Sequence, residues 1–155
     1  MNIRLMEIEE PKFPYKFQSS KDAYEAVKDY GRADREVFLC LFLNTKNQLV
    51  DCEPISIGAI SSASVYPREV LKSAILRNAS SIILAHNHPS GDVTPSSADL
   101  DITTQIIWAC ESVQIRILDH IIIGRESFLS MADSGKLSEL QSKVNTALSS
   151  FRGAS

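Results

Sequence analysis

The chain has 155 residues and a formal net charge of −3 at pH 7, with 44% hydrophobic and 23% charged residues. This composition is ordinary for a soluble globular protein and argues against a disordered chain. The longest purely apolar run, Val37 to Leu43, is far shorter than the roughly 18 residues that a membrane span requires. No basic stripe is visible, so charge gives nucleic-acid binding no support.

The N-terminal residues show no basic region followed by an apolar segment, and we therefore expect a cytoplasmic protein without membrane association. Three cysteines are present, and no two of them form a Cys-x-x-Cys pair; they are Cys40, Cys52 and Cys110. We expect reduced thiols in a protein of this compartment. A chain of this length can bury enough surface to fold without a disulfide or a structural metal.

Residues 1–18 have no clear hydrophobic period and are expected to form an extended arm, followed by a single domain over residues 19–155. Ser19 and Ser20 predict the start of a helix that ends near Gly31, where a left-handed C-terminal residue is expected. The remaining chain predicts alternating strands and helices. In order they are a strand over 37–43, a turn over 44–47, a strand over 48–57, a helix over 67–77, a strand over 81–85, a loop over 86–95, a helix over 96–113, strands over 115–123 and 126–131, and a helix over 137–148. This order indicates an α/β fold in layers around a central mixed β-sheet.

Two of the three histidines lie close together, as His86 and His88. Neutral imidazole is a common zinc ligand. Residues two apart at the end of a strand project from the same face, so both rings can reach one ion. The alternative is a polar loop with two solvated imidazoles.

Asp99 strengthens the metal interpretation. The helix after Ser96 carries an apolar stripe at steps of three and four residues, formed by Ile102, Ile106, Ala109, Cys110 and Val113. Asp99 lies three residues before this stripe and shares its face, whereas Asp101 falls on the other side. A buried carboxylate is costly without a cation or several donors. Ser96 and Asp99 could also form a capping box. Beside the two histidines, we favour a zinc site with three protein ligands and a fourth position for water.

A water activated by zinc needs a base that accepts its proton. Three glutamates are candidates. Glu36 precedes the most apolar strand, Glu53 lies in the following strand, and Glu69 lies in a first helical turn, where capping suffices to explain it. We favour Glu36, because its position next to a buried strand would partly remove it from water.

The pattern His86-x-His88-Pro89 followed by Ser96-x-x-Asp99 resembles the JAMM motif of the JAB/MPN metalloprotease superfamily. Within that superfamily, three short segments are similar to the bacterial RadC-like proteins. They are His-Asn-His-Pro-Ser-Gly at 86–91, Val-Tyr-Pro-Arg-Glu-Val at 65–70 and Leu-Asp-His at 118–120. The similarity extends from about Asp34 to Met131.

The resemblance implies a cytidine-deaminase-like α/β/α sandwich that holds one zinc ion per chain. It implies zinc ligands at His86, His88 and Asp99, a general base at Glu36, and stabilisation of an oxyanion by Ser96.

A third histidine, His120, recurs in the RadC-like pattern without an assigned role. We expect a structural histidine that bonds to Asp119 or to the backbone. Full-length RadC-like proteins carry an N-terminal helix-hairpin-helix module. The 33 residues before Asp34 hold no paired glycines of that kind, so we expect this chain to lack it.

Two functions remain in view. The first is a zinc-dependent metallohydrolase, a peptidase or isopeptidase that acts on a peptide or protein substrate. The second is a non-catalytic JAB/MPN interaction module, which could act in DNA transactions. A nucleotide deaminase would need His-x-Glu and Pro-Cys-x-x-Cys, and neither occurs in this sequence.

Overall fold

The structure is a computed structural model that describes residues 15–59 and 64–153. Most of the predicted N-terminal arm lies outside these residues. Its last part forms a two-residue strand, β1 (Tyr15–Lys16), which pairs with the strand β3 (Gln48–Ile57) in antiparallel orientation. The last part of the arm therefore contributes an edge strand to the sheet.

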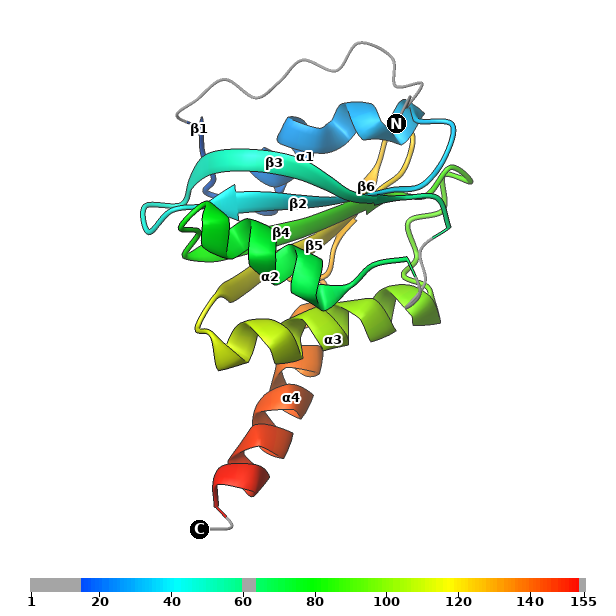
Figure 1. Ribbon diagram of the computed structural model, residues 1–155. Coiled ribbons are helices and arrows are strands. Elements are labelled where there is room, and N and C mark those ends of the chain that lie inside the picture. The colour runs from blue at the N-terminus through cyan, green and yellow to red at the C-terminus, as the bar shows by residue number, and fades with distance from the viewer. Residues whose placement is uncertain (1–14, 60–63, 154–155) are drawn as a thin grey trace.

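A six-stranded mixed sheet lies at the centre of the molecule (Figure 1), in the order β1-β3-β2-β4-β5-β6. The four strands not yet given are β2 (Val37–Leu43), β4 (Ser81–Asn87), β5 (Arg116–Ile123) and β6 (Phe128–Ser130). All neighbours are antiparallel except β4 and β5. Parallel neighbours need a crossover connection, which the helix α3 (Ser97–Ser112) supplies.

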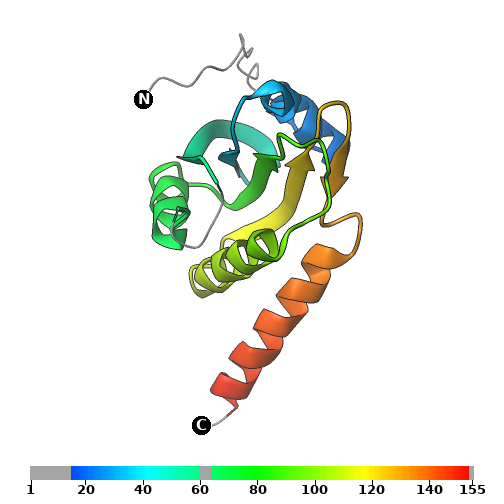
Figure 2. The ribbon, with the colours of Figure 1, turned by 90° about the vertical axis from the view of Figure 1, so that its right-hand side faces the viewer.

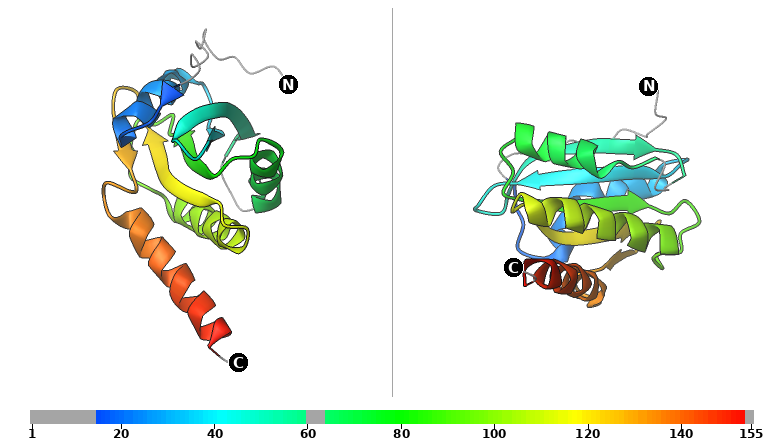
Figure 3. Two further views of the ribbon diagram at one scale, coloured as in Figure 1. Left: turned by 90° about the vertical axis from the view of Figure 1, so that its left-hand side faces the viewer. Right: turned by 60° about the horizontal axis from the view of Figure 1, so that its bottom comes forward.

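Helices cover both faces of the sheet (Figures 1 and 2). One face carries α1 (Ser20–Val27) and the short 3-10 helix η1 (Lys28–Arg32), whereas the other carries α2 (Pro67–Leu76), α3 and the first turns of α4 (Lys136–Arg152). Figure 3 shows α2, α3 and α4 side by side on the second face. These layers confirm the predicted α/β/α sandwich. No helix in the described ranges is both long and apolar enough to cross a membrane.

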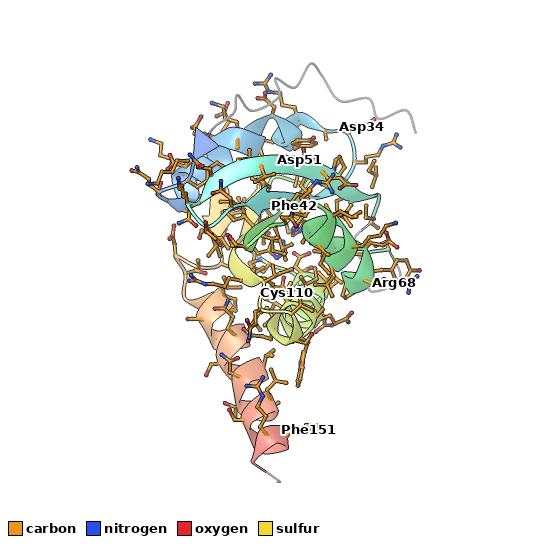
Figure 4. The ribbon with its side chains drawn as sticks, turned by 60° about the vertical axis from the view of Figure 1, so that its left-hand side comes forward. Asp34, Phe42, Asp51, Arg68, Cys110 and Phe151 are labelled. Atoms are coloured by element: carbon orange, nitrogen blue, oxygen red, sulfur yellow. The ribbon has the colours of Figure 1, made fainter. Side chains whose placement is uncertain are left out.

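The strand β2 explains why a continuous apolar run occurs in the sequence. Phe38, Cys40 and Phe42 face the hydrophobic cluster under α2 and α3, and the alternating leucines of β2 face the cluster under α1. A strand buried on both faces has no solvent side and therefore needs no polar alternation. In Figure 4, Phe42 and Cys110 lie in the interior, and both are fully or almost fully buried.

Three expectations about the elements need correction. β4 runs to Asn87 rather than Ala85, because it pairs with β2 on one side and β5 on the other through His86. Gly31 does not end a helix in the left-handed region; it lies within η1, where a Cβ would collide with the carbonyl oxygen of Gly124. The last helix begins one residue earlier and extends four residues further than predicted, and its exposed end carries Phe151 (Figure 4).

Candidate metal centre

The two histidines and Asp99 meet where β4 ends and α3 begins. His86 Nε2 lies 2.8 Å from His88 Nε2 and 3.0 Å from Asp99 Oδ1, and His88 Nε2 lies 3.0 Å from Asp99 Oδ2. One nitrogen or oxygen atom from each residue lies within 4.8 Å of the other two. His86 and Asp99 are buried, and His88 is partly exposed. The three predicted ligands therefore come together as a group that could hold a metal ion.

The protonation of His88 fits a metal ligand. Its Nδ1 lies 2.6 Å from the carbonyl oxygen of Asp92, which can only accept a hydrogen bond, so Nδ1 carries the proton. In the neutral ring the lone pair is then on Nε2, the atom that faces His86 and Asp99. Two imidazole nitrogens and a carboxylate are a donor set that zinc prefers, and three protein ligands leave a position open.

Tight turns bring Asp92 back to the His88 ring. The backbone N–H of Gly91 donates to the carbonyl oxygen of His88 at 2.9 Å. Gly91 has a φ of 86°, a left-handed conformation that glycine adopts without a steric penalty. The side chain of Asp92 in turn accepts from the backbone N–H of Thr94 at 2.9 Å, so the loop is held from both sides.

The electrostatics of the site depend on the Asp99 carboxylate. Burial on its own would raise the pKa of Asp99, but the hydrogen bonds that His86 and His88 donate when their rings are protonated outweigh it and hold that pKa well below the usual range. The hydrogen bond that the protonated His88 ring donates to Asp99 raises the pKa of His88 above its ordinary value, against the opposing effect of burial. The carboxylate is thus an anion that favours positive charge beside it, whether that charge is a proton on His88 or a metal ion.

Ser96 and Asp99 also form the capping box that the sequence offered as an alternative. Ser96 Oγ accepts from the Asp99 N–H at 3.0 Å, and Asp99 Oδ2 accepts from the Ser96 N–H at 2.8 Å. The two interpretations are compatible, because the same carboxylate faces both histidines. The cap holds the carboxylate in that orientation at the start of α3.

Asn87, between the two histidines, holds the backbone around Glu36. Its side-chain Oδ1 accepts from the Val37 N–H at 2.7 Å, and its Nδ2 donates to the Arg35 carbonyl oxygen at 2.9 Å. Asn87 is fully buried, and Glu36 is half-buried. The residue between the two candidate ligands thus fixes the chain on both sides of the predicted base.

The other two candidate bases lie elsewhere. Glu53 sits opposite Cys40 in the β2–β3 register and pairs with Arg77 at 2.8 Å. Glu69 is exposed in the first turn of α2. Only Glu36 of the three contributes to the raised pKa of His88, after the larger effect of the Asp99 hydrogen bond. The charge of Glu36 therefore acts on this site, and its role as the base stays a prediction.

Replacing Asn87 with alanine should destabilise the protein. Asn87→Ala leaves the buried N–H of Val37 and the part-buried carbonyl of Arg35 without their side-chain partner. We expect the free energy of unfolding to fall by about 1–3 kcal/mol, the usual cost of an unsatisfied buried polar group. Urea unfolding would measure this. Asn145→Ala, at an exposed position of α4, should change the same quantity by no more than about 0.5 kcal/mol. Equal stability of the two variants would contradict the role given to Asn87.

The structure gives His120 a place that the sequence did not predict. Its ring does not bond to Asp119 or to the backbone: Nε2 lies 2.9 Å from His86 Nδ1, and Nδ1 lies 2.6 Å from Thr103 Oγ1. Only the backbone N–H of His120 donates to Asp119, at 2.7 Å. Complete burial lowers the pKa of His120 well below its usual value, so the ring is neutral. The sequence-based predictions do not single out Thr103 as a partner of this site. The signal that could have found it is its position one helical turn after Asp99, on the same face of α3.

Comparison with known proteins identifies the family of this chain. The family described as "RadC-like JAB domain" matches residues 17–136. A UPF0758 protein of Leptothrix cholodnii is 47% identical over 121 residues, which cover 75% of this chain and 54% of the relative. A UPF0758 protein of Desulforamulus reducens is 52% identical over 109 residues, covering 70% and 48%. UPF0758 protein YfjY of Escherichia coli is 50% identical over 104 residues, covering 67% and 65%.

The His-x-His strand end and the aspartate at the start of the next helix lie within the residues that this family matches. The chain belongs to the RadC-like JAB domain family. It spans about half to two thirds of the length of the three relatives named above.

Proposed function

We propose that the protein is a zinc-dependent metallohydrolase, a peptidase or isopeptidase that cleaves a peptide or protein substrate. One observation carries the proposal: His86, His88 and Asp99 turn their ligand atoms toward one another at the end of β4, where His88 is partly exposed, in a chain of the JAB family. A structural zinc site is closed by four protein ligands, whereas three ligands leave a position for chemistry.

The chain's own residues would divide the work at this site. When bound, zinc would lower the pKa of a water molecule and polarise the scissile carbonyl. Glu36 would accept the proton of the attacking water and pass it to the leaving amine. The oxygen of Ser96 accepts from the backbone of Asp99, so its own hydrogen is available for donation to the developing oxyanion.

The alternative is an interaction module that has lost its chemistry. Such a module would need neither a metal-binding carboxylate nor a general base. Every residue type of the proposed mechanism is nevertheless present in this chain. The relatives' names assign no activity. The complete residue set favours catalysis.

The state of the cysteines supports our proposal of a cytoplasmic location. All three are free thiols. Burial raises the pKa of Cys52 and Cys110 to about 12, which makes both thiols poor nucleophiles. Unpaired cysteines of this kind are typical of proteins in a reducing compartment.

Zinc removal provides the test of hydrolysis. The zinc-loaded protein would be incubated with peptide and isopeptide-linked libraries, and new amino groups would be identified by mass spectrometry. We expect cleavage that a chelator abolishes and added zinc restores. The chelated protein should stay folded and lose only the stabilisation that binding supplies, because its core does not include the metal. Cleavage that is indifferent to the chelator would contradict the proposal, and a zinc-loaded protein that cleaves neither library would favour the interaction module.

A further inference from the structure

A chain of hydrogen bonds runs behind the candidate metal centre, through three side chains that are completely buried: His86, His120 and Thr103. His86 Nδ1 lies 2.9 Å from His120 Nε2, and His120 Nδ1 lies 2.6 Å from Thr103 Oγ1. Thr103 Oγ1 donates to the backbone carbonyl of Asp99 at 2.6 Å. The chain thus begins at one candidate ligand and ends at the backbone of another, and it links β4, β5 and α3.

The direction of every proton in this chain follows from its last member. The carbonyl oxygen of Asp99 can only accept, so Thr103 donates its single hydroxyl hydrogen there. The oxygen of Thr103 must then accept from His120, which places the His120 proton on Nδ1. A neutral His120 with its proton on Nδ1 has a lone pair on Nε2 and accepts from His86 Nδ1.

The same donors and acceptors determine which nitrogen of the neutral His86 ring carries the proton. With its proton on Nδ1, the neutral His86 ring has its lone pair on Nε2, the atom that lies 3.0 Å from Asp99 Oδ1 and 2.8 Å from His88 Nε2. The opposite orientation would put a proton on His86 Nε2, where it would block a metal ion. A backbone carbonyl group determines which nitrogen of His88 carries the proton. His86 faces the imidazole of His120 instead, so the position of its proton depends on the hydrogen bond between His120 and Thr103.

We propose that His120 and Thr103 are a pair of positioning residues that hold His86 in its metal-binding tautomer. The inference rests on the proposed zinc-dependent function. It gives a positioning role to two residues that are not themselves metal ligands. Partners of this type fix the ring orientation of a ligating histidine, and their loss typically weakens metal binding by 10–100-fold. Thr103 also holds the first turn of α3, so one side chain restrains His86 and Asp99 together.

Zinc binding tests the role of Thr103 and needs no substrate. Zinc affinity would be measured by competition with a chromophoric chelator. Thr103→Val removes the hydroxyl at nearly constant volume, and we expect zinc affinity to fall by about 10–100-fold. Thr103→Ser restores a hydroxyl and should recover most of the affinity.

The neighbouring Thr104 supplies the matched control. Its hydroxyl donates to the backbone carbonyl of Leu100 at 2.8 Å, the same bond one residue further along α3. Thr104→Val should therefore leave zinc affinity within about 2-fold, since it disturbs the helix in the same way without touching His120. Equal weakening in the two valine variants, or unchanged affinity in Thr103→Val, would overturn the proposal.

The tautomers themselves can be observed in the metal-free protein. Long-range proton–nitrogen NMR spectra of uniformly labelled protein distinguish a ring nitrogen that bears a hydrogen from one with a free lone pair. We expect His120 to carry its proton on Nδ1 in the wild type and in Thr103→Ser. A proton on Nε2 of His120 would overturn the proposal. This measurement decides the inference even if the protein binds no zinc, a result that would count against the proposed function alone.

Discussion

The Glu36→Gln variant should lose about 10²–10⁴-fold in kcat on any substrate that the wild type cleaves, the usual contribution of a general base. Glutamine has nearly the same size as glutamate but cannot accept a proton at neutral pH. Glu36 is not one of the three ligands, so the zinc content should equal that of the wild type. Metal analysis and steady-state kinetics on the same preparations would measure both quantities.

Glu69→Gln is the matched control for this experiment, because it makes the same change at an exposed glutamate in the first turn of α2. Its turnover should match the wild type. A Glu36→Gln protein with full turnover would remove Glu36 from the mechanism. A loss of zinc in Glu36→Gln would show instead that this residue supports the site rather than the proton transfer.

Sequence patterns within single strands and helices predict the burial of β2 and the positions of Asp99, His86 and His88. The apolar run that became β2 has no polar alternation, and the structure buries it on both faces. Helical periodicity placed Asp99 on the buried face of its helix, where it is 2% exposed. Spacing of two residues brought His86 and His88 to one face. Each of these patterns acts within a single element, and the sheet and helix geometry then determines the outcome.

The place of His120 depends on a feature that no local pattern reveals. Ile82 pairs with Ile117, but the next residue, Ile83, pairs with Asp119, so β5 contains an irregularity at Leu118. An uninterrupted strand would put His120 on the face opposite Ile117, because side chains alternate with a period of two. The extra residue reverses the alternation. His120 therefore lies on the same face of the sheet as His86, in the neighbouring strand, and sequence spacing alone could not have shown this.

The role of Asn87 was equally hidden, for a different reason. Its partners are the backbone groups of Arg35 and Val37, which precede Asn87 by 52 and 50 residues. Only the antiparallel pairing of β2 with β4 brings them together. The sequence predicted Glu36 from its place before an apolar strand and from the family resemblance. The structure adds the side chain that holds the backbone of Glu36 in place.

The zinc content of the protein purified without added metal is the most direct test of the metal centre. The wild type should contain about one zinc ion per chain, the expectation for a site with three protein ligands. His88→Ala should contain little, because it removes one of the three. Asp101→Asn, an exposed aspartate on the same helix as Asp99, should retain the wild-type content. Equal zinc content in all three proteins would contradict the assignment of His86, His88 and Asp99 as its ligands.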